Sequence, residues 1–241
     1  MRYKCLVSYD GTLFHGFQVQ RKLRTVQSEI EAVLLIILKE KIRIYGAGRT
    51  DTGVHALGQV FHFDTDIDMK AESMCRAINS RLPKDIYIKK VEIVNNEFHS
   101  RYSAKSKLYK YIIDIGEYNP LYNNYRYYYH YKICIEGFIS ASRIFIGEHD
   151  FSAFTKNHKL TDTTRTIYSF DTEVKDNLIT ISIHGDGFMH NMIRIIIAML
   201  LEVARGRINQ DDLQLILKSK NRKLAPKIVP PNGLYLVNVE Y

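Results

Sequence analysis

The pattern of apolar and polar residues predicts alternating strands and helices along the first half of the chain. Residues 2–9 alternate like a half-buried strand and stop at the turn dipeptide Asp10-Gly11. Thr25 is then suited to cap a helix, because apolar residues recur at helical spacing between 26 and 37. The same reasoning predicts a helix around 74–78 that Pro83 breaks, and strands at 42–45, 59–63 and 86–94.

The second half of the chain repeats this plan loosely. We expect strands at 108–115, 165–174, 178–184 and 234–240, and helices at 136–146, 188–204 and 209–218. The fold class is therefore predicted as α+β, with two similar halves whose sheets meet and a groove between them as the usual place for a site. The expected domains are residues 1–105 and residues 106–241.

Charge suggests a class of partner. The 34 Lys and Arg exceed the 26 Asp and Glu, which gives a net charge of +8, a pI near 9.2 and a natural affinity for polyanions such as nucleic acid. One segment also interleaves bases with aromatic residues, a combination suited to phosphate contacts and base stacking. It comprises Arg101, Tyr102, Lys105, Lys107, Tyr109, Lys110 and Tyr111. Ordinary solubility charge and half-buried tyrosines are the alternative explanation.

Cysteine usage and hydropathy indicate a cytoplasmic protein that does not enter a membrane. The three cysteines lie far apart, without the close pairs of zinc or redox sites, which fits a reducing compartment. The first residues do not resemble a secretory signal. The most apolar runs, 33–38 and 192–201, are much shorter than the ~20 residues that a membrane helix needs, so we expect core helices.

The loop from Gly46 to His55 is the first candidate site, because it presents Asp51 among glycines that permit unusual backbone angles. In the alternative interpretation it is a tight turn, in which Asp51 caps the backbone and Arg49 forms a surface ion pair. Neither common glycine-rich phosphate motif is present here. Asp51 and His55 could ligate a metal, but no further ligand follows at a recognisable spacing, and His55 is expected to be structural.

Arg194 is the second informative residue, because it lies in a helix with apolar neighbours almost all round. A guanidinium buried without an anion is costly, whereas one paired with a carboxylate keeps that carboxylate ionised. We hypothesise that Arg194 faces Asp51. In the alternative, its stem covers the helix while its head reaches water, with His190 one turn earlier on the same face.

Several motifs occur together over nearly the whole chain. They are Tyr9-Asp10-Gly11, Phe14 to Gln18, Gly48 to Asp51, Gly58 to Val60, Phe98-His99 with Arg101, Tyr109 to Tyr111, Phe188 to Arg194, and Gly233 to Leu236. In this combination the chain resembles the TruA family of tRNA pseudouridine synthases. The resemblance implies the pseudouridine synthase fold, with antiparallel sheets joined into one continuous sheet. Thr52 and Phe17 depart from the family's common alanine and tryptophan, which bears on target preference rather than on the reaction.

The resemblance also implies residue roles. Asp51, in the N-terminal domain, would be the nucleophile, while Tyr109 and Arg194, in the C-terminal domain, would stack on the target uracil and pair with Asp51. The implied substrate-binding residues are Tyr109, Arg49, Arg101, His190 and Leu234. Such an enzyme isomerises uridines 38, 39 and 40 in the anticodon stem-loop of tRNA, as a homodimer without cofactor or metal.

Two other functions remain open at this stage. A catalytically silent RNA-binding protein would also pair sheets with aromatic residues and lysines. A metal-dependent hydrolase could use Asp51, His55 and His190, and it would lose activity with a chelator.

Overall fold

The computed structural model describes residues 1–157 and 160–241, and its contacts divide the chain into two compact units. Unit 1 comprises Met1–Lys107 with Tyr235–Tyr241, and unit 2 comprises Leu108–Leu234. In sequence, unit 2 is therefore inserted between the two parts of unit 1. The last strand packs with the first half of the chain, whereas the expected domain of residues 106–241 includes it. The expected boundary after residue 105 stays a prediction about functional domains.

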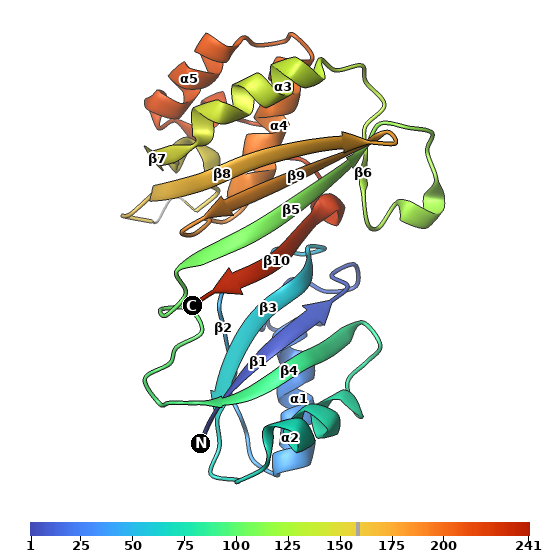
Figure 1. Ribbon diagram of the computed structural model, residues 1–241, viewed down its shortest axis with the longest axis vertical. Coiled ribbons are helices and arrows are strands. Elements are labelled where there is room, and N and C mark those ends of the chain that lie inside the picture. Colours follow the sequence, from blue (N-terminus) through green and yellow to red (C-terminus); the bar gives the residue numbers. More distant parts are fainter. Residues whose placement is uncertain (158–159) are drawn as a thin grey trace. The chain divides into compact units, whose positions relative to one another are not determined.

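Unit 1 combines strands with two helices (Figure 1). Its strand order is β4 (Ile86–Val94), β1 (Arg2–Tyr9), β3 (His55–Asp64) and β10 (Leu234–Glu240), with β2 (Tyr45–Gly46) also paired to β3. Strand β1 is antiparallel to β3 and β4, whereas β10 runs parallel to β3. The helices are α1 (Val26–Leu38) and α2 (Ala71–Asn79), and α2 packs against both β4 and α1.

The core of unit 1 follows from the alternation in β1. Tyr3, Cys5, Val7 and Tyr9 are all buried, while the residues between them are partly exposed. Burial of one strand face in this way supplies most of the hydrophobic stabilisation of a half-covered sheet. Helix α1 begins at a capping box, in which the Thr25 side chain and Ser28 each accept from the other's backbone N–H.

Unit 2 also combines strands with helices. Its strand order is β5 (Ser106–Asp114), β9 (Leu178–Gly185), β8 (Thr164–Lys175) and β7 (Gly147–Asp150), with β6 (Tyr127–Tyr128) parallel to β5. The helices are α3 (Ile135–Ser142), α4 (Met192–Ala204) and α5 (Gln210–Ser219). Short 3-10 turns are η1 (Pro120–Tyr122), η2 (Arg143–Phe145), η3 (Ser152–Phe154), η4 (Arg222–Leu224) and η5 (Pro231–Gly233).

Helix α4 is the centre of unit 2. It contacts α3 and α5, and the three helices gather beside β8 and β9 in Figure 1. Nearly all of its residues are buried, and Arg194 is among the few that are partly exposed. The α+β fold class is confirmed.

The strand predicted at residues 42–45 is wrong, and hydrogen bonds to α1 explain why. Residues 42–45 alternate like a strand, yet only Tyr45–Gly46 pairs with a neighbour. The Ile44 N–H instead donates to Glu31 Oε1 at 3.0 Å, and the Ile44 carbonyl accepts from Gln27 Nε2 at 3.3 Å. The backbone of Ile44 therefore forms hydrogen bonds with side chains of α1 and not with a neighbouring strand.

Two predicted helices have different bounds. The helix expected over 188–204 begins only at Met192, because Asn191 before it adopts a left-handed conformation with φ 60°. The helix expected over 136–146 ends at Ser142 and continues as the turn η2. Strand β7 follows that turn and was not predicted.

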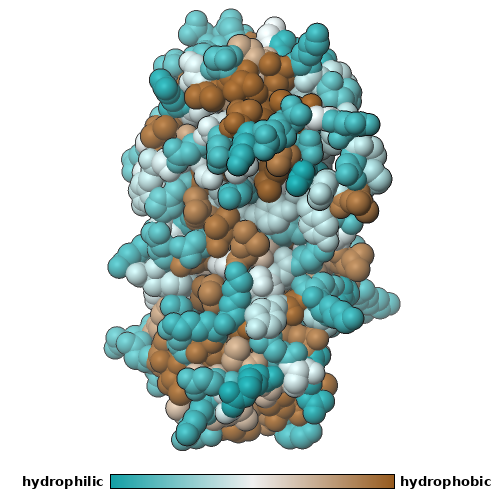
Figure 2. All heavy atoms as spheres, turned by 45° about the vertical axis from the view of Figure 1, so that its right-hand side comes forward, coloured by the Kyte–Doolittle hydropathy of each residue, from teal (hydrophilic) through white to brown (hydrophobic). Residues whose placement is uncertain are grey.

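Within the ranges that the structure covers, no helix is both long and apolar enough to cross a membrane. On the face drawn in Figure 2, hydrophobic patches lie among hydrophilic side chains. Scattered apolar exposure of this kind is normal for folded proteins.

Candidate active site

Asp51 lies in the loop between β2 and β3, and the segment after β1 supports this loop. The Phe17 N–H donates to the Thr50 carbonyl at 3.2 Å, and the Gly53 N–H donates to the Phe14 carbonyl at 3.2 Å. These two bonds flank Asp51, whose side chain is partly exposed. The backbone on either side of the carboxylate is therefore anchored to the same neighbouring segment.

Side chains of β1 and β3 form hydrogen bonds with the loop residues that precede Asp51. The Tyr9 hydroxyl and Thr50 Oγ1 are 2.8 Å apart in the core, and Gln59 Nε2 donates to the Gly48 carbonyl at 3.0 Å. Burial raises the pKa of Tyr9 despite hydrogen bonds that lower it, so the phenol keeps its proton at neutral pH. Gly48 and Thr50, on either side of Arg49, thus have fixed surroundings before the chain reaches Asp51.

Gly16 explains why a glycine occurs in the motif after β1. Its backbone has φ +85°, and a Cβ atom there would lie 2.6 Å from the Thr50 carbonyl oxygen and 3.3 Å from the Asp51 carbonyl carbon. Only glycine adopts this conformation without strain and permits so close an approach. The resemblance pointed to the motif, and the structure adds that it supports the Asp51 loop.

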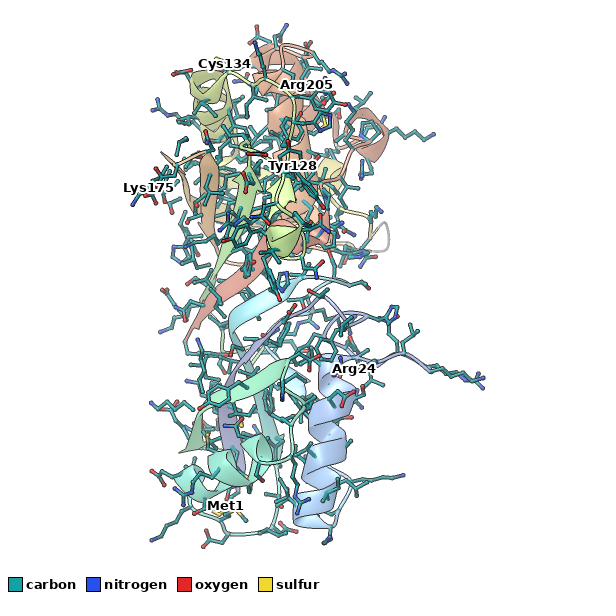
Figure 3. The ribbon with its side chains drawn as sticks, turned by 90° about the vertical axis from the view of Figure 1, so that its right-hand side faces the viewer. Met1, Arg24, Tyr128, Cys134, Lys175 and Arg205 are labelled. Carbon is teal, nitrogen blue, oxygen red and sulfur yellow. The ribbon has the colours of Figure 1, made fainter. Side chains whose placement is uncertain are left out.

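Arg24 fixes the other end of that supporting segment (Figure 3). Its guanidinium makes two hydrogen bonds to Asp85, at 2.7 and 3.0 Å, and its Nε donates to Glu29 Oε1 at 2.9 Å. It also lies 4.2 Å from the centre of the Phe14 ring. A two-pronged arginine contact restricts geometry more than a single ion pair does. The segment is thereby tied to α1 and to the residue that precedes β4.

His55 has a structural environment. It is 2% exposed, its Nδ1 accepts from the Gly11 N–H at 3.0 Å, and its ring stacks on Tyr235 at 4.8 Å between centroids. Within residues 1–157 and 160–241, no three His, Cys, Asp or Glu side chains are grouped so that they could hold a metal ion. His55 thus positions the turn after β1 next to the Asp51 loop.

In unit 2, Tyr109 lies on the buried face of β5. It is 8% exposed, and its ring meets the Phe188 ring edge-on, with centroids 5.2 Å apart and planes 77° apart. Tyr111 shares this face and donates from its hydroxyl to the Pro230 carbonyl at 2.8 Å. The Tyr109 ring is thus positioned by the segment that leads to Arg194.

Arg194 is held near the start of α4. Its Nε donates to the Val229 carbonyl at 2.9 Å, and its Nη1 donates to Asn191 Oδ1 at 2.8 Å. Both acceptors are neutral, so they orient the guanidinium without cancelling its charge. Asp51 belongs to the other unit, and its pairing with Arg194 stays a prediction.

The remaining predicted site residues have varied surroundings. Arg49 is exposed beside the Asp51 loop, and Arg101 is exposed with its guanidinium 5.9 Å from the ring centre of Tyr102, itself 78% exposed. His190 is exposed, whereas Leu234 is only 6% exposed at the start of β10. The substrate contacts expected of these residues stay predictions. The motifs contain Tyr9 and Thr50, but sequence reasoning gave neither a role, because their contact joins segments far apart in sequence.

Comparison with known proteins identifies the family. A sequence profile described as tRNA pseudouridine synthase matches residues 6–103 and 141–241. The chain is 43% identical to "tRNA pseudouridine synthase A" of Bacillus subtilis strain 168, covering 100% of this chain and 99% of that protein. The protein of the same name from Anoxybacillus flavithermus is 41% identical, with 100% and 98% covered.

Similarity to solved structures is distant. A chain of a Cbf5-Nop10-Gar1 complex matches 82% of this chain and 54% of its own length, at 11% identity and a TM-score of 0.37. A likeness this low adds nothing to the assignment, which rests on the profile and on identity along the whole chain. The chain belongs to the family of tRNA pseudouridine synthases, which are isomerases.

Proposed function

We propose that this protein isomerises uridine to pseudouridine in tRNA, with Asp51 as the nucleophile. Family membership supports the substrate and the reaction class. The observation that carries the residue assignment is the loop around Asp51, whose backbone is held on both sides by Phe14 and Phe17. A catalytic carboxylate needs such a fixed position, because a small misplacement lowers the rate steeply.

The reaction exchanges one glycosidic bond for another. The bond from ribose C1′ to uracil N1 breaks, the base turns, and a bond from C1′ to C5 forms, while the C5 hydrogen leaves to water and N1 takes up a proton. A carboxylate can assist either by attacking C1′ or by helping to form a glycal. In both routes Asp51 acts in its ionised form, and the detached uracil must be kept in a closed pocket.

Tyr109 and Arg194 complete the proposed catalytic group. A cation beside a desolvated carboxylate keeps that carboxylate ionised, and the oriented guanidinium of Arg194 is suited to this role. The target base must leave its stack at a cost of a few kcal/mol, which stacking on the Tyr109 ring would offset. Arg49, Arg101, His190 and Leu234 are the further residues that we propose to contact the RNA.

The resemblance supports a finer proposal. The targets are uridines 38, 39 and 40 of the anticodon stem-loop, and the enzyme works in the cytoplasm as a homodimer without cofactor or metal. Mapping pseudouridine in modified tRNA would identify the positions, and sedimentation would give the oligomeric state. Modification confined to another arm of the tRNA would contradict the first statement, and a monomer at working concentration would contradict the second.

Tritium release from tRNA labelled at uridine C5 tests the reaction, because the C5 hydrogen is lost only when the new bond forms. We expect wild-type protein to release tritium and Asp51→Asn to fall to background while it still binds tRNA. Asp66→Asn, at an exposed position of unit 1, is the matched control and should release tritium like wild type. Equal release by Asp51→Asn would reject the nucleophile. Binding of tRNA by the wild type without any release would favour the silent RNA-binding protein.

A further inference from the structure

Unit 2 contains a cavity of about 400 Å³ that the proposed reaction does not use. It is lined by Ser152, Thr155, Asn157, Leu160, Thr163, Lys220, Asn221, Arg222 and Lys223. Three of these described lining residues are cations and none is acidic, while all but one of the others carry a hydroxyl or an amide. Positive charge combined with hydrogen-bond donors suits an oxyanion.

Asp150 ties the two segments that form this cavity. Its Oδ1 accepts from the Ser152 N–H at 3.0 Å and from Thr163 Oγ1 at 2.7 Å, and its Oδ2 lies 2.9 Å from Lys220 Nζ. Burial tends to raise the pKa of Asp150, but the hydrogen bonds from Thr163, Lys220 and Ser152 outweigh burial and hold that pKa below its usual range. The Asp150 carboxylate is therefore ionised. It joins the two segments and offsets the charge of Lys220. Among the residues that the structure describes, no carboxylate forms an ion pair with Arg222 or Lys223.

Arg222 supplies a second, independent observation. Its Nη1 donates to the Ala225 carbonyl, whereas its Nε is buried without a hydrogen-bond acceptor among the residues that the structure covers. No carboxylate of those residues forms an ion pair with it, and burial lowers the pKa of its guanidinium. A partly buried guanidinium without a carboxylate partner is a cost to folding that an anion bound beside it would relieve.

The cavity is connected to the segment that leads to Arg194. Thr155 Oγ1 and the Lys156 N–H both donate to the His190 carbonyl at 3.3 Å. A ligand in the cavity would therefore bind to the loop that positions His190, four residues before Arg194. This places the cavity beside residues that we propose to contact the RNA.

We propose that this cavity binds a phosphate of the tRNA backbone and so anchors the RNA beside the segment that carries His190 and Arg194. The proposal rests on the proposed function, because it takes tRNA as the partner. No aromatic residue is among the described lining, so a base finds no ring on which to stack. The contact is therefore to the phosphodiester and is independent of sequence.

The test compares three single charge removals. Arg222→Gln and Lys223→Gln each remove a cation of the cavity, and Lys223 is exposed, so its replacement leaves packing unchanged. Lys175→Gln is the matched control: this exposed lysine of the same unit ends β8 (Figure 3), roughly 35 Å along the strand from the Thr163 end. Affinity for tRNA is measured by filter binding over a range of salt concentrations.

We expect each cavity variant to bind tRNA about tenfold more weakly, with a salt slope smaller by about one. Lys175→Gln should stay within about twofold of wild type. The proposal is overturned if Lys223→Gln and Arg222→Gln keep wild-type affinity and slope, or if Lys175→Gln loses as much. Thermal unfolding of each variant identifies any that fails to fold.

A second measurement separates RNA from small phosphates. Inorganic phosphate is added to wild type and to Lys223→Gln, and thermal stability is recorded. Stabilisation of the wild type alone, together with unchanged tRNA affinity in the variant, would assign the cavity to free phosphate and overturn the RNA contact. Tritium release is independent of this result: a protein that binds tRNA through the cavity but releases no tritium would refute the proposed reaction and leave the phosphate contact intact.

Discussion

Replacing Gly16 by alanine tests whether the segment after β1 positions Asp51. The added Cβ would lie 2.6 Å from the Thr50 carbonyl oxygen, where ordinary contacts begin at about 3.4 Å. Both the Thr50 oxygen and the Asp51 carbonyl carbon, 3.3 Å away, are backbone atoms that cannot rotate aside. The loop must therefore move by roughly 0.5–0.8 Å, and Asp51 moves with it.

The size of the effect follows from two contributions. The positive φ of Gly16, +85°, costs an alanine about 1 kcal/mol, and overpacking adds about 1–3 kcal/mol. A loss of about 2–4 kcal/mol lowers the melting temperature by roughly 5–15 °C for a chain of this size. Displacement of a catalytic group by up to about 1 Å lowers turnover by roughly 10- to 100-fold.

The assay is tritium release at saturating tRNA, well below the melting temperature of the variant. Gly206→Ala is the control, because Gly206 also has a positive φ, +68°, but no atom lies within 4 Å of a Cβ there. It should lose only about 1 kcal/mol and keep wild-type turnover. Full turnover in Gly16→Ala, or the same stability loss in both variants, would refute the reasoning.

Three further predictions address other parts of the molecule. Tyr109→Phe keeps the ring that meets Phe188, so its tRNA affinity should stay within about twofold, whereas Tyr109→Leu should weaken binding by about 5- to 100-fold; equal affinities would contradict stacking. Arg194→Leu should lower tritium release at least 100-fold while tRNA affinity changes less than about threefold, and undiminished turnover would remove the proposed role. Burial, with His99 and Arg2 nearby, lowers the pKa of His62 to about 4. The unfolded chain then binds more protons between pH 6.5 and 4, so stability falls as pH drops through this window, by about 2 kcal/mol at pH 5. Urea unfolding at pH 7 and pH 5 should show a larger loss in wild type than in His62→Gln, in which His99 still has a lowered pKa; an identical loss in both would be evidence against it.

The pattern of apolar and polar residues correctly predicted several strands of the fold. Strands β1, β4 and β10 occur at the predicted residues. Buried and exposed positions alternate strictly along β1, whereas β4 and β10 each break the alternation once. The segment 42–45 has the same alternation and is not a strand, since Glu31 on α1 binds its backbone. Pattern alone does not distinguish a strand partner from a side-chain acceptor that lies elsewhere in the chain.

Candidate site residues could be proposed from the sequence, whereas the contacts that support them could not. Asp51 could be singled out from the glycine-rich loop, and Arg194 from its apolar helix. The contacts of Gly16 with the Thr50 backbone join segments far apart in sequence, so no spacing rule reports them. The cavity at Arg222 was not predicted for the same reason: Asp150 joins its two segments only in the folded unit.

The parallel pairing of β10 with β3 has a consequence for biosynthesis. Tyr235 and Leu236 pair with His55 and Ala56, directly after the Asp51 loop, yet the ribosome adds them only after all of unit 2. That delay is on the order of 10 s at usual translation rates. The nascent chain therefore lacks the strand that pairs with His55 and Ala56 until β10 has been added. We therefore expect the Asp51 loop to gain its last neighbouring strand only late in synthesis, after the whole of unit 2.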